Sequence, residues 1–180
     1  MIIVAVFPPY VYSIRYGDGE EKDEFSRLLE LWTDVDYLAD YFETNCSRMN
    51  PEVWGDGLEP EVVANQAIYE AYELEDTFEE LTWNTDHVQH PDFDDFFKPL
   101  DGEFVYEWEL IPVKAYGPEK PSLLRLYAIK MGENCYLVTG GGIKVCRTMQ
   151  EDPDLNKELD KIKTVRSFLR NQGIETREDF

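Results

Sequence analysis

The sequence predicts an α+β fold with a small antiparallel sheet of four to five strands. Short apolar runs with a period of two, separated by turn residues, occur over residues 2–16 and 104–147. Two stretches in the first half and one near the C-terminal end instead carry apolar residues at helical spacing. The order is therefore β-α-α-β-β-β-α, with two N-terminal helices and one C-terminal helix. A length of 180 residues suits one domain, so residues 1–180 are predicted to form a single domain.

The N-terminal half is predicted to hold one or two strands and then two helices. Apolar residues alternate over residues 2–6 and 10–16, and Pro8-Pro9 marks a bulge or sharp turn between them. Helical spacing predicts a first helix over residues 25–45. A second helix is expected over residues 60–81, where the proline at its start suits the first helical position.

The C-terminal half is predicted to be a meander followed by a helix. Residues 84–102 are expected to form an acidic, irregular insertion. Short strands are then expected over residues 104–110, 123–131, 135–139 and 143–147. Asp152 and Pro153 predict the start of a final helix that stops near Gly173, which leaves residues 174–180 as a tail.

Composition excludes several classes of protein. A hydrophobic content of 43% with 14% aromatic residues allows a packed core and argues against intrinsic disorder. No run of 18 apolar residues predicts a membrane-spanning helix, and the first residues lack the pattern of a signal peptide. The three cysteines are widely spaced, which favours reduced thiols and a cytoplasmic protein.

The charge distribution singles out one segment of the chain. The protein has 38 acidic and 17 basic side chains, yet residues 114–147 contain six basic and only two acidic side chains. Five of these bases lie on consecutive predicted strands or at their ends: Lys114, Arg125, Lys130, Lys144 and Arg147. Together with Tyr127 or Tyr136 they could form a patch that binds phosphate. The alternative is a solvated face whose cations pair with acids elsewhere in the protein.

Two other motifs give weaker signals. The run Gly140-Gly141-Gly142 lacks the pattern of a nucleotide P-loop, and a bulge or wide turn is favoured over an anion site. His87 and His90 lie near several aspartates, but the spacing in an irregular segment favours solvating charge over metal ligation. We therefore predict no metal site and no cofactor.

The segment LLRLYAIKMGENCYLVTGGGIKVCRTMQEDPDLNKELD carries a family resemblance. Its Arg-x-Tyr strand at Arg125 and Tyr127, the returning apolar strand, and the Gly142-Ile143-Lys144 segment resemble the RelE/HigB superfamily of toxins from bacterial toxin–antitoxin systems. The resemblance covers roughly residues 114–171 and extends to the first half only through the order of elements.

This resemblance implies a metal-independent endoribonuclease that acts on RNA, in many members at the ribosome. It implies that Arg125 and Lys144 stabilise the phosphate, that Arg147 assists, and that Tyr127 or Tyr136 stacks on a base or transfers a proton. Lys114 and Lys130 would help to bind the substrate. A neutralising antitoxin, of the helix-turn-helix type, would be the protein partner.

A second hypothesis uses the same scaffold without catalysis. The acidic helices of the first half would bind a basic partner or mimic the charge of a nucleic acid. In that case the protein would be an acidic interaction protein and no enzyme.

Overall fold

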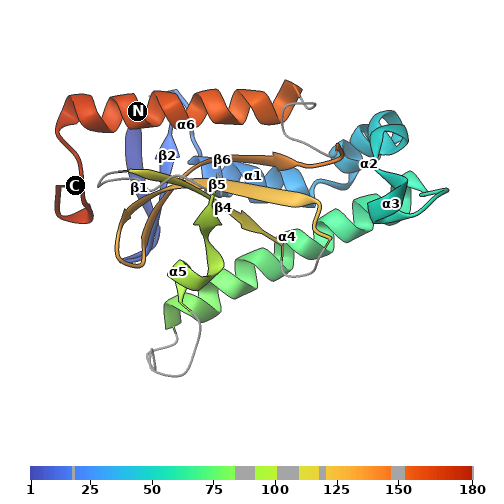
Figure 1. The fold of residues 1–180 in the computed structure, drawn as a ribbon, viewed down its shortest axis with the longest axis horizontal. Coiled ribbons are helices and arrows are strands. Elements are labelled where there is room, and N and C mark those ends of the chain that lie inside the picture. Colours follow the sequence, from blue (N-terminus) through green and yellow to red (C-terminus); the bar gives the residue numbers. More distant parts are fainter. Residues whose placement is uncertain (18, 84–91, 101–109, 118–120, 147–152, 180) are drawn as a thin grey trace.

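A computed structural model describes residues 1–17, 19–83, 92–100, 110–117, 121–146 and 153–179. It shows an α+β architecture in which a six-stranded sheet has helices on both faces (Figure 1). The strand order is β1-β2-β6-β5-β4-β3. The strands are β1 (Ile2–Phe7), β2 (Val11–Arg15), β3 (Lys98–Pro99), β4 (Ile111–Tyr116), β5 (Leu124–Gly132) and β6 (Cys135–Ile143). The α+β class is thus confirmed.

The predicted sheet of four to five antiparallel strands is wrong in two respects. The sheet has six strands among the described residues, and it is mixed because β2 runs parallel to β6. The helices between β2 and the meander carry the chain across the sheet, as a parallel pair requires. β1 pairs with β2 as an antiparallel hairpin whose turn holds Pro8-Pro9.

The helices of the described residues are six in number. They are α1 (Glu24–Thr33), α2 (Val35–Asn45), α3 (Pro51–Trp54), α4 (Pro60–Trp83), α5 (Phe93–Phe96) and α6 (Pro153–Gln172). The predicted order with two N-terminal helices is therefore too simple. α4 and α6 follow the prediction closely, and Gly173 with a φ of 71° ends α6 as expected.

The first predicted helix is in fact two helices. Asp34 has an extended backbone, ends α1, and accepts a hydrogen bond from the Tyr37 N–H as the N-cap of α2. The apolar spacing continues across this break, so periodicity alone predicted one helix. Both α1 and α2 pack against α4.

The predicted acidic insertion is partly regular. Asp92 caps α5 in a capping box, and β3 pairs with β4 through Lys98 and Pro99. Residues 84–91 and 101–109 lie outside the described part, and so does most of the strand predicted over 104–110.

A single strand replaces the last two predicted strands. β6 runs through the three glycines to Ile143, and its register with β5 shifts where Gly140 faces Tyr127 and Val138 faces Ala128. The shift is a bulge, which was the favoured prediction for the glycine run.

The two faces of the sheet have separate cores. Leu124, Leu126 and Ala128 of β5 join α1, α2 and α4 in one core. Tyr127 and Ile129 point the other way, toward α6. None of the helices described is long and apolar enough to cross a membrane.

The second half of β6 has an open edge. β2 pairs only with Tyr136, Leu137 and Val138, so residues 139–143 have no strand neighbour on that side within the described part of the chain. α1 and α6 pack against β6 from the two faces. The open edge of β6 thus lies between these helices.

Candidate functional site

The predicted basic strip is divided between the two faces of the sheet. Lys130 and Tyr136 are cross-strand partners, and Tyr136 belongs to the core on the α4 side. Arg125 and Tyr127 are an odd number of residues from Lys130, so they point to the α6 side. The strip therefore does not form one patch.

On the α4 side, Lys130 and Tyr136 hold α5 against the sheet. The Lys130 ammonium lies 2.8 Å from a carboxylate oxygen of Asp94, and the Tyr136 hydroxyl donates to the same side chain. Although burial opposes the change, these hydrogen bonds lower the pKa of Asp94. The Tyr136 ring stacks on Phe97 with centroids 4.3 Å apart.

The two predicted tyrosines are part of the core. Tyr127 is 0% exposed and Tyr136 is 1% exposed. Stacking on a base, or transfer of a proton to a substrate, would require either ring to leave its core. Their packing role is what the structure shows directly.

On the α6 side, three predicted cations gather. Arg125 Nη1 donates to the carbonyl oxygens of Ser122 (2.8 Å) and Leu124 (2.6 Å), and its guanidinium lies 4.4 Å from the centre of the Tyr116 ring. Arg125 and Lys144 line one small cavity of about 90 Å³. We call Lys114, Arg125 and Lys144 the cation cluster.

The cation cluster is electrostatically unbalanced. Burial, then the positive charges of Arg125 and Lys114, lower the pKa of Lys144. Lys114 donates to the carbonyl oxygen of Leu100, and Arg125 contacts carbonyls and a ring. Within the described residues, no carboxylate forms an ion pair with any of the three. Arg147, the remaining predicted cation, lies outside the described residues.

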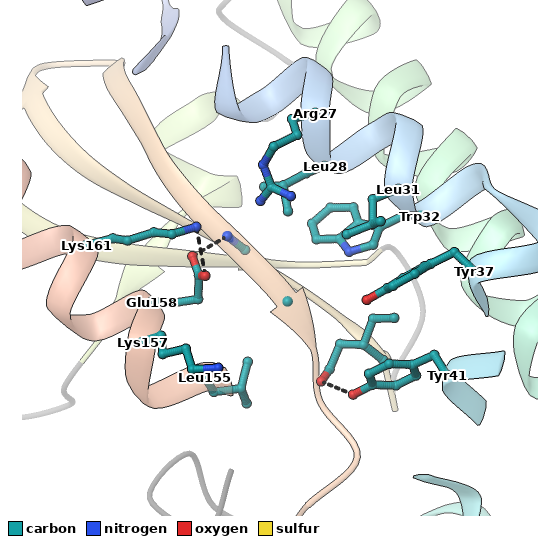
Figure 2. A pocket seen from close by; sticks show the side chains of 13 residues that line it. Arg27, Leu28, Leu31, Trp32, Tyr37, Tyr41, Leu155, Lys157, Glu158 and Lys161 are labelled. Carbon is teal, nitrogen blue, oxygen red and sulfur yellow. Dashed lines mark hydrogen bonds and ion pairs between the residues drawn. The ribbon is translucent and has the colours of Figure 1, made fainter. Parts of the chain in front are cut away.

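A second site, which the sequence did not predict, lies at the open edge of β6. A cavity of about 340 Å³ opens between α1, α2, β6 and α6 (Figure 2). One side is aromatic, with Trp32, Tyr37 and Tyr41. The polar lining consists of Arg27, Lys157, Glu158 and Lys161. We call this cavity the edge pocket.

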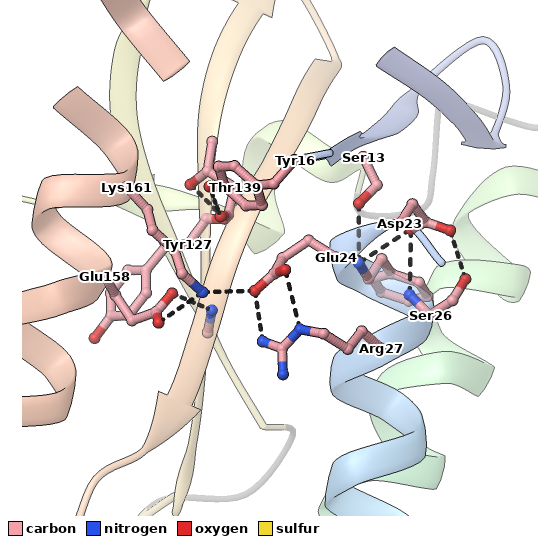
Figure 3. A network of polar contacts seen from close by, with 12 residues as sticks. Ser13, Tyr16, Asp23, Glu24, Ser26, Arg27, Tyr127, Thr139, Glu158 and Lys161 are labelled. Atoms are coloured by element: carbon pink, nitrogen blue, oxygen red, sulfur yellow. Dashed lines mark hydrogen bonds and ion pairs between the residues drawn. The ribbon is translucent and has the colours of Figure 1, made fainter. Parts of the chain in front are cut away.

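A network of charged side chains connects the polar lining of the edge pocket to Glu24, which lies behind it (Figure 3). The Glu24 carboxylate accepts hydrogen bonds from Arg27 Nε (3.0 Å) and Lys161 Nζ (2.8 Å). Lys161 also lies 2.9 Å from Glu158, whose other oxygen accepts from the Gly141 N–H at 3.0 Å. The network links α1, α6 and β6.

The two carboxylates of this network have opposite pKa shifts. Burial, together with the negative charge of Glu24, raises the pKa of Glu158 despite Lys161. For Glu24, burial is outweighed by hydrogen bonds from Arg27 and Lys161, which lower its pKa. Glu158 is thus the more readily protonated carboxyl of the pair.

Side chains replace a neighbouring strand along the open edge. The Tyr16 hydroxyl donates to the Thr139 carbonyl, and the Tyr41 hydroxyl donates to the Ile143 carbonyl at 3.3 Å. Between them, Glu158 accepts from Gly141. Burial raises the pKa of Tyr16, so this hydroxyl remains a donor.

The glycine run makes this arrangement possible. A Cβ atom on Gly140 would lie 1.9 Å from Glu158 Oε2, and one on Gly142 would lie 2.9 Å from Leu155 Cδ2. On the other face, a Cβ on Gly141 would lie 2.7 Å from the Arg125 carbonyl oxygen and 2.9 Å from Trp32. Three glycines therefore let α1 and α6 approach β6 from both sides.

Few features of the amino-acid sequence predict the edge pocket. Glu24 and Glu158 are two of 38 acidic residues, and no spacing distinguishes them. The one available signal was the glycine run, because consecutive glycines in a strand indicate a close approach by other groups.

Metal ligation has no support in the part of the chain that the structure describes. No group of three or more His, Cys, Asp or Glu side chains there lies close enough to hold a metal ion. His87 and His90 fall outside the described residues.

Comparison with known proteins found no match to a family model, to a curated protein or to a solved structure. The resemblance to the RelE/HigB toxins therefore stays a prediction that depends on the motifs around Arg125 and Lys144.

Proposed function

We propose that this protein binds the phosphate groups of RNA at the cation cluster and cleaves RNA as a RelE/HigB-like toxin, neutralised by an antitoxin. The observation that carries the proposal is the position of Lys144. Its ammonium is partly buried beside two other cations and has no ion-pair partner in the described residues. A phosphate bound there would relieve the repulsion among the three cations.

The chemistry would rest on charge stabilisation. Two carbonyl groups and the Tyr116 ring hold the Arg125 guanidinium in place before any ligand binds. A fixed guanidinium with an ammonium beside it is suited to the charge that develops on a phosphate during attack by a 2′-hydroxyl group. Tyr127 and Tyr136, which are packed in the cores, do not enter this arrangement.

The acidity of the whole molecule supports a local role for the cluster. A net charge of −21 repels RNA at long range. Binding through three cations would be short-ranged and would weaken as salt competes for the phosphate.

Induced expression in a bacterial host tests the proposal. Growth and protein synthesis should stop with the parent protein and continue with Lys144→Ala. Lys144 makes no side-chain hydrogen bond in the described residues, so this variant should fold. Lys163→Ala is the matched control, because Lys163 is 74% exposed on α6 and far from the cluster in the sequence. Equal arrest by parent and Lys144→Ala, or no arrest by abundant folded parent, would contradict the proposal.

A second candidate is the acidic interaction protein, and α4 favours it. Residues 60–83 contain no Lys, Arg or His. Tyr69 (47%), Tyr72 (55%) and Trp83 (79%) are exposed on this helix beside its acids. Aromatic side chains on an acidic surface fit a basic protein partner.

Binding to a basic helical peptide distinguishes the two candidates. For the interaction protein, Tyr72→Ser should weaken binding of a Lys/Arg-rich peptide, whereas Lys144→Ala should leave it unchanged. The toxin proposal expects the Lys144 variant, and not the Tyr72 variant, to lose RNA binding.

A further inference from the structure

We propose that the edge pocket is a second binding site, which takes a small ligand that joins a planar ring to an anionic group. A nucleoside monophosphate is the natural member of this class. The pocket shares no residue with the cation cluster, so this inference goes beyond the proposed function.

The aromatic side of the pocket suits a planar ring. Trp32 is 1% exposed and forms a fixed part of the lining. Tyr37 and Tyr41 are partly exposed, with ring centroids 6.0 Å apart and planes tilted by 34°. Figure 2 shows the three rings on one side of the cavity. A base or similar ring could pack against them as rings pack in proteins.

The polar side suits an anion. Arg27 uses Nε and Nη2 to bind Glu24, and its Nη1 group has no partner among the described residues. The Arg27 side chain is 40% exposed, and that of Lys161 is 29% exposed. Both cations are held in position by Glu24, so an anion would meet preorganised donors.

The charge balance of the pocket also favours an anion. Three cations line it (Arg27, Lys157 and Lys161) against one carboxylate, Glu158. Glu158 is already engaged by Lys161 and the Gly141 N–H, so its carboxylate does not point freely into the cavity. Glu24 lies behind the lining and binds Arg27 and Lys161 from that side, which leaves the outer N–H groups of Arg27 directed toward the cavity.

The size of the pocket limits the ligand. About 340 Å³ is near the lower end of the range for pockets that bind small molecules. This volume fits one nucleotide and excludes an oligonucleotide lying wholly inside. Leu28, Trp32 and Leu155 pack against the glycine run, so the floor is rigid.

Titration with nucleoside monophosphates tests the inference. AMP, GMP, CMP and UMP would be added to the purified chain, with tryptophan fluorescence and calorimetry as readouts. We expect saturable binding of at least one of them. Removing the phosphate (nucleoside) or the ring (ribose 5-phosphate) should each weaken binding by about tenfold or more.

Matched variants locate the site. Tyr37→Leu and Lys157→Ala should each weaken nucleotide binding severalfold, with thermal melting used to establish that they fold. The controls are Tyr72→Leu on exposed α4 and Lys163→Ala, which lies on α6 and pairs with Asp160. Neither control should change the affinity.

Two results would overturn the inference. One is the absence of saturable binding for all four nucleotides at millimolar concentration. The other is binding that Lys144→Ala abolishes while Tyr37→Leu and Lys157→Ala leave it intact, since the nucleotide would then occupy the cation cluster. If Lys144→Ala loses RNA binding but retains nucleotide binding, the result supports both the cation cluster as the RNA site and the edge pocket as the nucleotide site.

Discussion

At the scale of single residues, the three glycines of β6 have different tasks. Gly140 faces the end of the flexible Glu158 side chain, whereas Gly141 faces the backbone carbonyl of Arg125. A side-chain carboxylate can rotate away from a new methyl group, but a paired strand cannot. Substituting the three glycines should therefore reduce the free energy of unfolding by different amounts.

We expect Gly141→Ala to destabilise the protein more than Gly140→Ala. The first forces β5 and β6 apart and should cost about 3 kcal/mol or more, at the upper end of overpacking. The second displaces Glu158 from the Gly141 N–H and should cost about 1 kcal/mol. Urea unfolding measures both, with Gly19→Ala as the control because nothing lies within 4 Å of its new Cβ. A larger loss of unfolding free energy in Gly140→Ala than in Gly141→Ala would contradict this reading of the contacts around the two glycines.

Glu158 should make stability depend on pH in an unusual direction for a carboxyl group. Its folded-state pKa is raised, so the folded protein binds this proton more tightly than the unfolded chain does. The contribution of Glu158 to stability is then present below its ordinary pKa and is lost as pH rises through the raised value.

The variant Glu158→Gln removes this titration. It keeps an oxygen that can accept from Gly141, so the difference in unfolding free energy, variant minus parent, should increase between pH 4 and pH 7. Urea unfolding at several pH values checks this. Asp94→Asn should show the opposite trend at lower pH: the pKa of Asp94 is lowered, so the parent loses stability relative to this variant as pH falls below about 4. The same slope for both variants would argue against the pKa assignments.

At the scale of elements, Glu70 joins α4 to the start of β5. It is 0% exposed, and its carboxylate accepts from the N–H groups of Leu123 (2.9 Å) and Leu124 (3.1 Å) and from the Ser122 hydroxyl (2.8 Å). Ser122 O in turn accepts from Arg125. One acid thus positions the segment that carries Arg125 of the cation cluster.

Glu70→Ala should cost about 3 kcal/mol or more, because it leaves several buried donors without an acceptor. It should also reduce RNA binding, since the anchor of Arg125 would move. Glu73→Ala, one turn on and less buried, is the control and should change stability by less than about 0.5 kcal/mol. Thermal melting and RNA binding together measure the effect.

The sequence predicted helices well where the pattern lies within the helix itself. α4 and α6 have helical spacing and a proline at the start, and both were predicted. The break at Asp34 was missed because it depends on one capping carboxylate while the apolar spacing continues. The pairing of β2 with β6 was missed because it joins Val11 to Tyr136, for which no local pattern exists.

The candidate site shows the same division. Arg125 and Lys144 were predicted to share one patch because they lie on consecutive strands or their ends. In the structure they line one cavity, since β6 continues past Gly142, the cross-strand partner of Arg125. The separation of Lys130 from Arg125 follows from their odd spacing within one strand. The network of Glu24, Glu158 and Lys161 could not be predicted, since it joins helices from opposite ends of the chain.

At the scale of the whole molecule, the net charge of −21 dominates the electrostatics. Repulsion among the acids opposes compactness. Surface ion pairs such as Lys22–Glu30 and Lys163–Asp160 counteract this repulsion, but they are exposed and contribute little to the free energy of unfolding. Salt that screens these charges should therefore stabilise the fold by reducing the repulsion more than it destabilises the fold by weakening these ion pairs.

We expect the melting temperature to rise by a few degrees between about 10 mM and about 500 mM NaCl, since roughly 1 kcal/mol shifts it by about 2–4 °C at this size. Scanning calorimetry with NaCl and with KCl checks the effect. A fall in melting temperature with both salts would show that ion pairs outweigh the repulsion.

The parallel contact between β2 and β6 has a consequence for synthesis on the ribosome. Ser13 and its partner Val138 are separated by most of the chain. At about 5–20 residues per second, the N-terminal hairpin waits roughly 6–25 s for β6 to be made. During that time β2 offers the unpaired backbone groups that will later bind β6 to any other nascent chain. The acidic helices made next repel their counterparts on neighbouring polysomes, and so help to keep the waiting hairpins apart.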